Sequence, residues 1–147
     1  MTAKPLIAIA ADHGGFSLKA AILKAYGDQF DFLDLGTNSE ESCNYADYGH
    51  ALAEALEQGK AQQGIIICGS GIGISIAANR HKKIRAALCT DATMARLSRL
   101  HNDANVLALG ARIIGVQVAF DCIDVFFSTT FEGGRHQARI EKLDVGV

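Results

Sequence analysis

The sequence contains no tryptophan, a single proline and no excess of either charge, since 14 lysines and arginines stand against 16 aspartates and glutamates. A surface built for nucleic acid or for an anionic membrane is therefore not indicated. No apolar run approaches the roughly 20 residues that a bilayer-spanning helix needs. The first ten residues, MTAKPLIAIA, lead directly into Asp12-His13, which predicts a first strand and not a signal peptide.

Disulfide and metal motifs are also missing. The cysteines, at 43, 68, 89 and 122, form no C-x-x-C pair, and a chain of 147 residues needs no disulfides to hold its core. We therefore expect reduced thiols and a cytoplasmic protein. Asp47-x-x-His50 is a close pairing, but no two-histidine ligand spacing occurs, so no metal site is predicted. Without a linker or a long repeat, residues 1–147 are expected to form one domain.

Short apolar runs alternate with longer amphipathic segments along the whole chain. The runs predict five strands, at residues 6–12, 30–36, 64–69, 84–89 and 105–110. The other segments predict helices at residues 16–27, 45–59, 73–79, 91–100, 113–127 and 133–143. Strands that are each followed by a helix indicate a parallel sheet covered on both faces. The predicted fold class is α/β, a three-layer αβα sandwich with a doubly wound, Rossmann-like five-stranded parallel sheet.

In such a sheet the working site lies beyond the carboxyl ends of the strands. The most informative segment there is CGSGIGISIAANR, which begins at Cys68 and carries Gly69, Gly71 and Gly73. Glycines let a ligand approach the backbone, and the N-terminus of the following helix offers unpaired N–H groups, so the loop is a candidate anion site. The alternative is a tight turn that only packs helix against strand.

Several known loops do not fit this segment. A dinucleotide fingerprint fails because Ile74 stands where its third glycine belongs, and the Gly-Lys-Ser/Thr of a P-loop is absent. A cysteine phosphatase, with Cys-x5-Arg, fails because Ile74 also occupies the arginine position. The serine elbow G-x-S-x-G fails because Cys68 and Ile72 stand where its glycines should be.

A thiol at the mouth of this loop suits proton transfer. A helix N-terminus favours the thiolate form of a cysteine, so Cys68 is a candidate base for a carbon next to a carbonyl. The loop amides would hold the resulting enediolate oxygen, and Ser70 would share the hydroxyl proton. The alternative for Cys68 is a small buried apolar residue, and composition does not decide between the two.

Two polar pairs follow predicted elements. Asp12 and His13 come after the first strand, where His13 suits a phosphate and Asp12 suits a sugar hydroxyl, although Asp12 could simply cap a helix. His101 and Asn102 come at the end of a helix. His101 suits proton delivery to a sugar ring oxygen and Asn102 suits sugar hydroxyls, although the helix dipole alone would favour a histidine there.

Arginines form a third group of candidates. Arg135 and Arg139 are spaced i, i+4, so on a helix they are neighbours that would clamp a dianion. The alternative is that they are solvated and pair with Glu132 or Glu141. Arg112, after the fifth strand, is a further candidate for the same phosphate.

Four motifs in order resemble the type-B ribose-5-phosphate isomerases, a family shared with the galactose-6-phosphate isomerase subunits. They are DHGG, CGSGIGISIAANR, LSRLHNDANVLALGAR and FEGGRHQARI, and the match covers essentially the whole chain. The resemblance implies an aldose–ketose isomerase without metal or cofactor. It implies interconversion of D-ribose 5-phosphate and D-ribulose 5-phosphate through a cis-enediolate, in the non-oxidative branch of the pentose phosphate pathway.

The resemblance also implies a role for the residues of the glycine loop. Cys68 matches the base that moves the proton between C2 and C1. Gly69, Gly71 and Gly73 match the amides that hold the enediolate, which places the phosphate elsewhere. Ser70 matches a position that keeps a hydroxyl in the family.

The remaining candidates match the ring-opening and binding residues of the family. His101, helped by Asp12, matches the ring-opening pair, Asn102 matches a contact to sugar hydroxyls, and Tyr45 matches a residue that lines the pocket. The phosphate ligands match four basic residues: His13, Arg112, Arg135 and Arg139. The family implies a homodimer or homotetramer with sites shared between subunits. Phe126, Phe127 and Phe131 would suit such an interface or the core.

Two departures from the family pattern bear on these expectations. The segment Asn44-Tyr45-Ala46-Asp47 replaces the usual Asp-Tyr-Pro-Asp, which would loosen the pocket wall at Tyr45. Ser75 stands where some relatives carry a glutamate base, which favours the cysteine version. Two other functions stay open, an isomerase of a six-carbon phosphate such as allose or galactose 6-phosphate, and a sugar-phosphate-binding module without catalysis.

Overall fold

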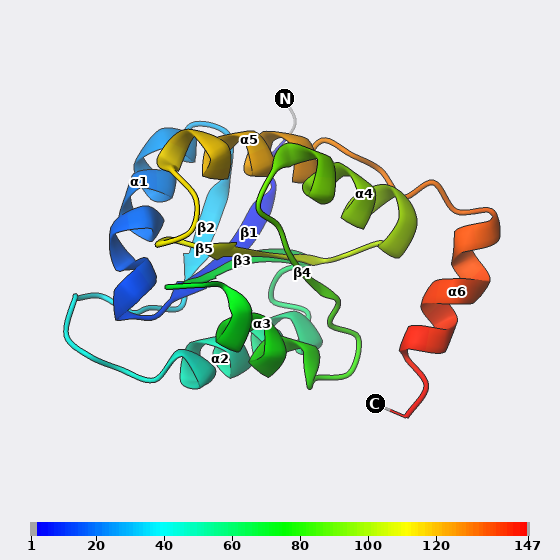
Figure 1. Cartoon of the computed structure of the whole chain (residues 1–147), viewed down its shortest axis with the longest axis horizontal. Helices are drawn as coiled ribbons and strands as arrows, with labels where there is room; N and C mark the ends of the chain where they lie inside the picture. The colour runs from blue at the N-terminus through cyan, green and yellow to red at the C-terminus, as the bar shows by residue number, and fades with distance from the viewer. Residues whose placement is uncertain (1–2, 147) are drawn as a thin grey trace.

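A computed structural model describes residues 3–146, which form five strands and six α-helices around one sheet (Figure 1). The strands are β1 (Leu6–Ala11), β2 (Asp31–Asp34), β3 (Gln63–Cys68), β4 (Ala86–Leu88) and β5 (Val106–Gly110). All neighbouring strands pair in parallel, in the order β2-β1-β3-β5-β4. The predicted α/β fold class with a five-stranded parallel sheet is therefore confirmed.

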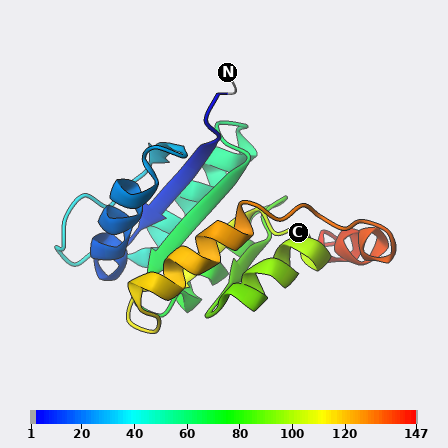
Figure 2. The same cartoon turned by 90° about the horizontal axis from the view of Figure 1, so that it is seen from above.

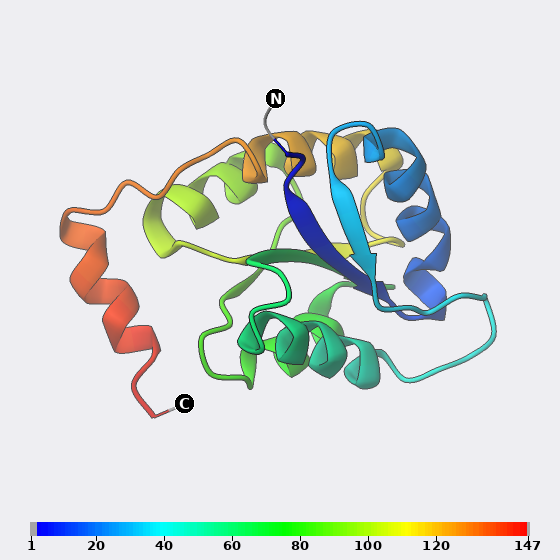
Figure 3. The same cartoon turned by 180° about the vertical axis from the view of Figure 1, so that it is seen from behind.

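The helices cover both faces of this sheet. They are α1 (Phe16–Tyr26), α2 (Tyr45–Glu57), α3 (Ile72–Asn79), α4 (Ala92–Asn102), α5 (Val116–Phe126) and α6 (Arg135–Leu143). Helices α2 and α3 lie on one face, and α1, α4 and α5 lie on the other (Figures 1 and 3). Seen from above, α6 stands clear of the sheet beyond α4 (Figure 2). None of the described helices is long and apolar enough to cross a membrane.

The central strand β3 shows why these residues form a buried strand. Ile65, Ile66 and Ile67 are fully buried, and β-branched side chains suit a strand packed on both faces. Ile65 and Ile67 pack into the cluster under α1, α4 and α5, whereas Ile66 and Cys68 pack into the cluster under α2 and α3. Each fully buried isoleucine contributes about 1.5–3 kcal/mol, so this strand anchors both layers.

The aromatic residues near the end of α5 belong mainly to the core. Phe126 is fully buried, and Phe127 packs against its ring in an edge-on arrangement with centroids 4.9 Å apart. Phe131 lies beyond this helix and is half-buried. For Phe126 and Phe127 the core alternative therefore holds.

The topology places the chain's polar loops at two opposite edges of the sheet. β1 and β3 are neighbours, but the helices that follow them, α1 and α3, lie on opposite faces of the sheet (Figure 1). The carboxyl ends of these two strands therefore border a crevice. Helix α4 returns from this edge, and Asn105 beyond its end accepts a hydrogen bond from Gly64 at the start of β3 (3.0 Å). A strand of six residues spans about 17 Å, so the end of α4 lies a full strand length from the carboxyl edge.

Candidate active site

A cavity of about 590 Å³ opens at the carboxyl edge, where the loops after β1, β3 and β5 meet. Its lining residues are Asp12, Tyr45, Cys68, Gly69, Ser70, Ile72, Gly73, Ile76, Arg112 and Ile113. Seven of the predicted site residues therefore line one cavity: Asp12, Tyr45, Cys68, Gly69, Ser70, Gly73 and Arg112. The cavity lies at the switch point between β1 and β3, where open parallel sheets bind ligands.

The glycine loop turns sharply because of Gly71. This residue has a left-handed backbone (φ +78°) and forms the N-cap of α3. A Cβ there would lie 2.5 Å from Leu88 Cδ1 and 2.9 Å from the carbonyl carbon of Leu109, so no larger residue fits without movement. The turn lets the Gly71 amide donate a hydrogen bond to the Cys68 sulfur (3.2 Å). The sulfur is thus held as a hydrogen-bond acceptor at the N-terminus of α3.

The other two loop glycines, Gly69 and Gly73, allow two side chains to pack against the loop backbone. A Cβ on Gly73 would overlap the Tyr45 ring, so Tyr45 packs directly on the loop backbone. A Cβ on Gly69 would lie 3.4 Å from the Arg112 side chain, and the Arg112 amide donates to the Gly69 carbonyl (2.9 Å). The glycines therefore bring one aromatic ring and one guanidinium against the loop, which gives the cavity a positive wall.

Asp12 and His13 begin a short 3-10 helix, residues His13–Gly15, that the sequence did not predict. One Asp12 carboxylate oxygen accepts from the Gly15 amide (3.1 Å), so the capping alternative is realised while Asp12 also lines the cavity. His13 Nδ1 accepts from the Cys43 amide (3.2 Å). An acceptor Nδ1 leaves the proton of a neutral imidazole on Nε2, where it can donate to an anion.

The four thiols of the chain fall into different environments. Cys89 and Cys122 pack in the core under α4 and α5, and burial raises the pKa of Cys89 to about 12 and that of Cys122 to about 11. Cys43 is half-buried beside His13. Among the described cysteines, only Cys68 both lines this cavity and accepts a hydrogen bond from a backbone amide. This distinguishes it from cysteines that act as small apolar residues.

The second group of predicted residues lies elsewhere. His101 and Asn102 are the last residues of α4, and Arg135 and Arg139 lie on α6. They do not line the Cys68 cavity, because α4 ends at the amino edge of the sheet and α6 follows beyond it (Figures 1 and 2). Arg135 is exposed and its nearest acidic oxygen, on Glu132, is 3.9 Å away. Within one chain, the predicted site residues therefore form two separate groups.

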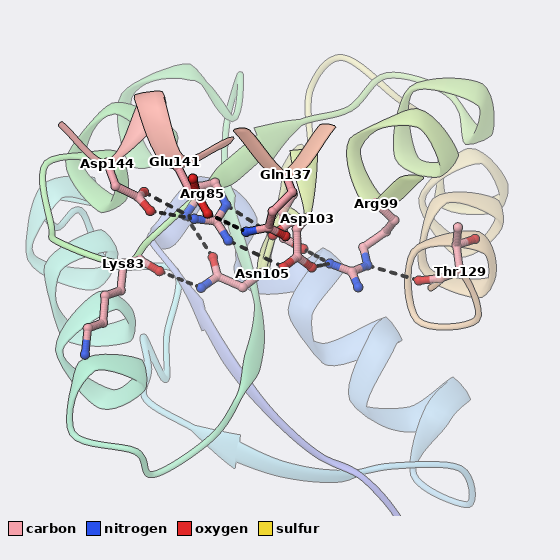
Figure 4. Close-up of polar contacts among 10 residues, drawn as sticks. Lys83, Arg85, Arg99, Asp103, Asn105, Thr129, Gln137, Glu141 and Asp144 are labelled. Atoms are coloured by element: carbon pink, nitrogen blue, oxygen red, sulfur yellow. Dashed lines mark hydrogen bonds and ion pairs between the residues drawn. The ribbon is translucent and has the colours of Figure 1, made fainter. Parts of the chain in front are cut away.

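The end of α4 is held by a network of charged side chains (Figure 4). Asp103 caps this helix with a left-handed backbone (φ +46°), and its carboxylate pairs with Arg99 (2.9 Å) and Arg85 (3.5 Å). Arg99 also donates to the Thr129 carbonyl (3.1 Å), and Arg85 reaches Asp144 after α6 (3.2 Å). Arg99 therefore links α4 to the segment before α6, and Arg85 links the start of β4 to the residue after α6.

A cluster of two histidines and a glutamate lies at the same edge. The His101 and His136 rings stack with centroids 4.4 Å apart and planes inclined by 17°. His136 Nε2 lies 3.6 Å from a Glu132 oxygen and has no hydrogen-bond partner among residues 3–146. Burial, helped by Arg135 and His101, lowers the pKa of His136.

Potential ligand atoms of His101, Glu132 and His136 lie within 4.8 Å of one another, the one such group in the described residues. The sequence prediction missed this cluster, and the Glu132-x-x-x-His136 spacing was its one signal.

Comparisons with known proteins agree with this fold. Residues 7–143 match the family described as Ribose/Galactose Isomerase. Ribose-5-phosphate isomerase B of Escherichia coli is 44% identical over 138 residues, which cover 93% of each chain. Among solved structures, ribose-5-phosphate isomerase B of Clostridium thermocellum is 47% identical with a TM-score of 0.93, covering 95% of each chain. That of Mycoplasma genitalium with bound ribulose-5-phosphate is 38% identical with a TM-score of 0.89, covering 95% of this chain and 93% of the other. The chain belongs to the ribose/galactose isomerase family.

Proposed function

We propose that this enzyme interconverts D-ribose 5-phosphate and D-ribulose 5-phosphate, in the cytoplasm and in the non-oxidative branch of the pentose phosphate pathway. The observation that carries the proposal is the Cys68 thiol, which lines a sugar-sized cavity and accepts a hydrogen bond from the Gly71 amide. The ribulose-5-phosphate bound to the Mycoplasma genitalium relative supports the choice of a five-carbon substrate.

In the proposed reaction, Cys68 moves one proton between two carbons. The thiolate takes the C2 proton of the open-chain aldose, the C2–H electrons form a C1=C2 bond, and the C1=O electron pair moves to O1, which gives a cis-enediolate. Transfer of a proton from the Cys68 thiol to C1, with formation of the C2=O bond, gives the ketose and regenerates the thiolate. The amides of Gly69 and Gly73 hold the enediolate oxygens, which carry the developing charge, and the Gly71 amide turns from the Cys68 sulfur to these oxygens once the sulfur is protonated. Ser70 shares the hydroxyl proton that passes between O2 and O1.

The ring must open before this step, because ribose 5-phosphate is mainly a furanose. We assign the proton transfer at the ring oxygen and the C1 hydroxyl to His101, helped by Asp12. Since His101 lies a strand length from the Cys68 cavity of its own chain, a second copy must supply it. The active form is thus a homodimer or homotetramer, and the same second copy brings Asn102 to the sugar hydroxyls.

The rim of the Cys68 cavity supports such an assembly. Four large apolar side chains there are 46–62% exposed: Tyr45, Ile72, Ile76 and Ile113. Apolar side chains gathered around a polar cavity are typical of a surface that is covered by another protein. We infer that a second copy covers this rim when it inserts its His101 group.

The phosphate is assigned to basic residues from both copies. Arg112 lies against the glycine loop, and His13 can donate from Nε2 at the same edge. Arg135 and Arg139 of the second copy complete the clamp, since guanidinium groups match phosphate oxygens in pairs. With its charge neutralised from two sides, the phosphate would fix the distance of C1 and C2 from Cys68.

A direct rate measurement tests this function. The purified protein is treated with a chelator and given ribose 5-phosphate at neutral pH, while ketose formation is followed. We expect turnover in the range of 1–1000 s⁻¹ that is common for enzymes. Turnover on allose or galactose 6-phosphate alone would replace the proposed substrate. Binding of sugar phosphates without turnover on any of them would contradict an isomerase.

A further inference from the structure

His136 contacts the histidine to which ring opening is assigned, and it comes from a different helix. Its ring, on α6, stacks on that of His101, at the end of α4, with centroids 4.4 Å apart. The two planes differ by only 17°, so the rings are nearly face to face. Such a contact limits rotation of the half-buried His101 ring about its side-chain bonds. The stack therefore links the position of His101 to the position of α6.

We infer that His136 is a positioning residue, which holds the His101 ring at the angle needed for proton transfer to the sugar ring oxygen. The inference rests on the role proposed above for His101. His136 itself does not reach the Cys68 cavity of its own chain. It acts on the reaction through the orientation of its neighbour.

His136 is suited to this role because it is itself held in place. It is 5% exposed, and its Nε2 lies 3.6 Å from a Glu132 carboxylate oxygen. The Glu132 amide donates to the carbonyl of Leu100, the residue directly before His101 (3.1 Å). The segment before α6 is thus fastened to the last turn of α4 by backbone as well as by stacking. The backbone contact and the stack therefore hold the two rings together.

The surroundings of the stack also favour a neutral His136. Burial lowers its pKa, and so do the charges of Arg135, His101 and Arg139, against an opposing effect of Glu132. The proposed proton transfer therefore falls to His101 and not to His136. Two charged imidazoles at this separation would repel each other and push the stack apart. A neutral His136 avoids this repulsion.

The same atoms could be considered as a metal site, but the geometry favours stacking. Metal-bound histidines direct their nitrogen lone pairs at one point about 2.0–2.1 Å from each nitrogen. Nearly parallel rings direct theirs side by side, so His101 and His136 do not converge. Arg135, which lies 3.9 Å from Glu132, and Arg139, whose charge acts on His136, would also repel a cation. Positioning is therefore the better reading of this cluster.

Three variants test the inference on chelator-treated protein with ribose 5-phosphate. For His136→Ala we expect kcat to fall about 10- to 100-fold with KM within about twofold, because Arg135 and Arg139 stay on α6. His136→Phe keeps a flat ring and should recover most of the loss. Gln137→Ala, the exposed neighbour, is the matched control and should behave like the wild type.

A second readout isolates the Cys68 step. Ribulose 5-phosphate has no ring, so exchange of its C1 hydrogen with D2O needs the base but not ring opening. We expect His136→Ala to keep this exchange while it loses turnover of ribose 5-phosphate. A rise in KM with unchanged kcat, or an equal loss of exchange and turnover, would show that His136 only supports α6 and would overturn the inference. Recovery of the wild type by added Zn²⁺ after chelation would overturn it in favour of a metal site. No turnover by the untreated wild type would instead refute the proposed function.

Discussion

The two edges of the sheet build their polar groups in different ways. At the carboxyl edge, the Cys68 cavity is shaped by backbone, with Gly71 in a left-handed turn and an amide aimed at the sulfur. At the amino edge, the His101 group is placed by side chains, with Asp103 in its own left-handed turn between Arg85 and Arg99. A backbone-built site suits a developing oxyanion, because its donors need not reorganise. The group built from side chains is the one proposed to reach into a second copy.

Removal of the thiol should have the largest effect of any change at the carboxyl edge. Cys68→Ala should lower kcat for ribose 5-phosphate by about 10²–10⁴-fold, because that is the typical contribution of a general base. Substrate binding, measured by calorimetry, should remain, since the phosphate ligands are untouched. Cys89→Ala is the matched control from the core and should keep its turnover. Near-normal turnover of Cys68→Ala would remove the thiol as base.

Breaking the backbone turn should cost stability as well as rate. Gly71→Ala forces an alanine into φ +78° and pushes its Cβ into Leu88, so the free energy of unfolding should fall by about 2–4 kcal/mol. Gly59→Ala is the control, because Gly59 has nearly the same φ (+76°) but no neighbour within 4 Å. It should lose only about 1 kcal/mol in urea unfolding. Equal losses would mean that overlap with Leu88 does not matter.

A smaller effect is expected from the turn at the amino edge. Asp103→Asn keeps a residue that tolerates φ +46° but removes the charge that Arg85 and Arg99 share. Because the carboxylate is partly exposed, the free energy of unfolding should fall by only about 1 kcal/mol. Turnover should fall several-fold, since His101 follows the end of α4. Asp144→Asn, which removes one Arg85 contact after α6, should leave turnover unchanged. A turnover of Asp103→Asn equal to that of the wild type would show that this network does not position His101.

The smallest effect concerns the thiols that the reaction does not use. The pKa values of Cys89 and Cys122 are raised by burial to about 12 and about 11, so the folded chain holds these protons more tightly than the unfolded chain. This stabilisation is complete below about pH 8.5, the ordinary thiol value, and is lost as the pH rises toward 11 or 12. Urea unfolding at pH 8 and pH 10 should show the decline, with a shallower slope in Cys89→Ala. A slope unchanged by that substitution would contradict this origin.

Sequence patterns predicted one edge of the molecule better than the other. The order of strands and helices followed from apolar periodicity, and the Cys68 loop followed from glycines directly after a buried strand. The position of β5 between β3 and β4 did not, because strand order depends on tertiary packing. The His136 stack was also missed, since its partner lies on another helix and no local spacing records the contact. The sequence motifs assigned His101 and Cys68 to one site, but only the fold shows that these residues lie at opposite edges of the sheet within one chain.

The central claim is that each site combines Cys68 of one copy with His101 of another. Cys68→Ala and His101→Asn chains, each inactive alone, can be mixed in equal amounts, unfolded and refolded together. Random pairing makes half of the dimers mixed, and one of their two sites then has both residues, so about a quarter of the wild-type turnover should return. If Cys68 and His101 served the same site from one chain, every site would lack one of them. The refolded mixture would then be as inactive as its components.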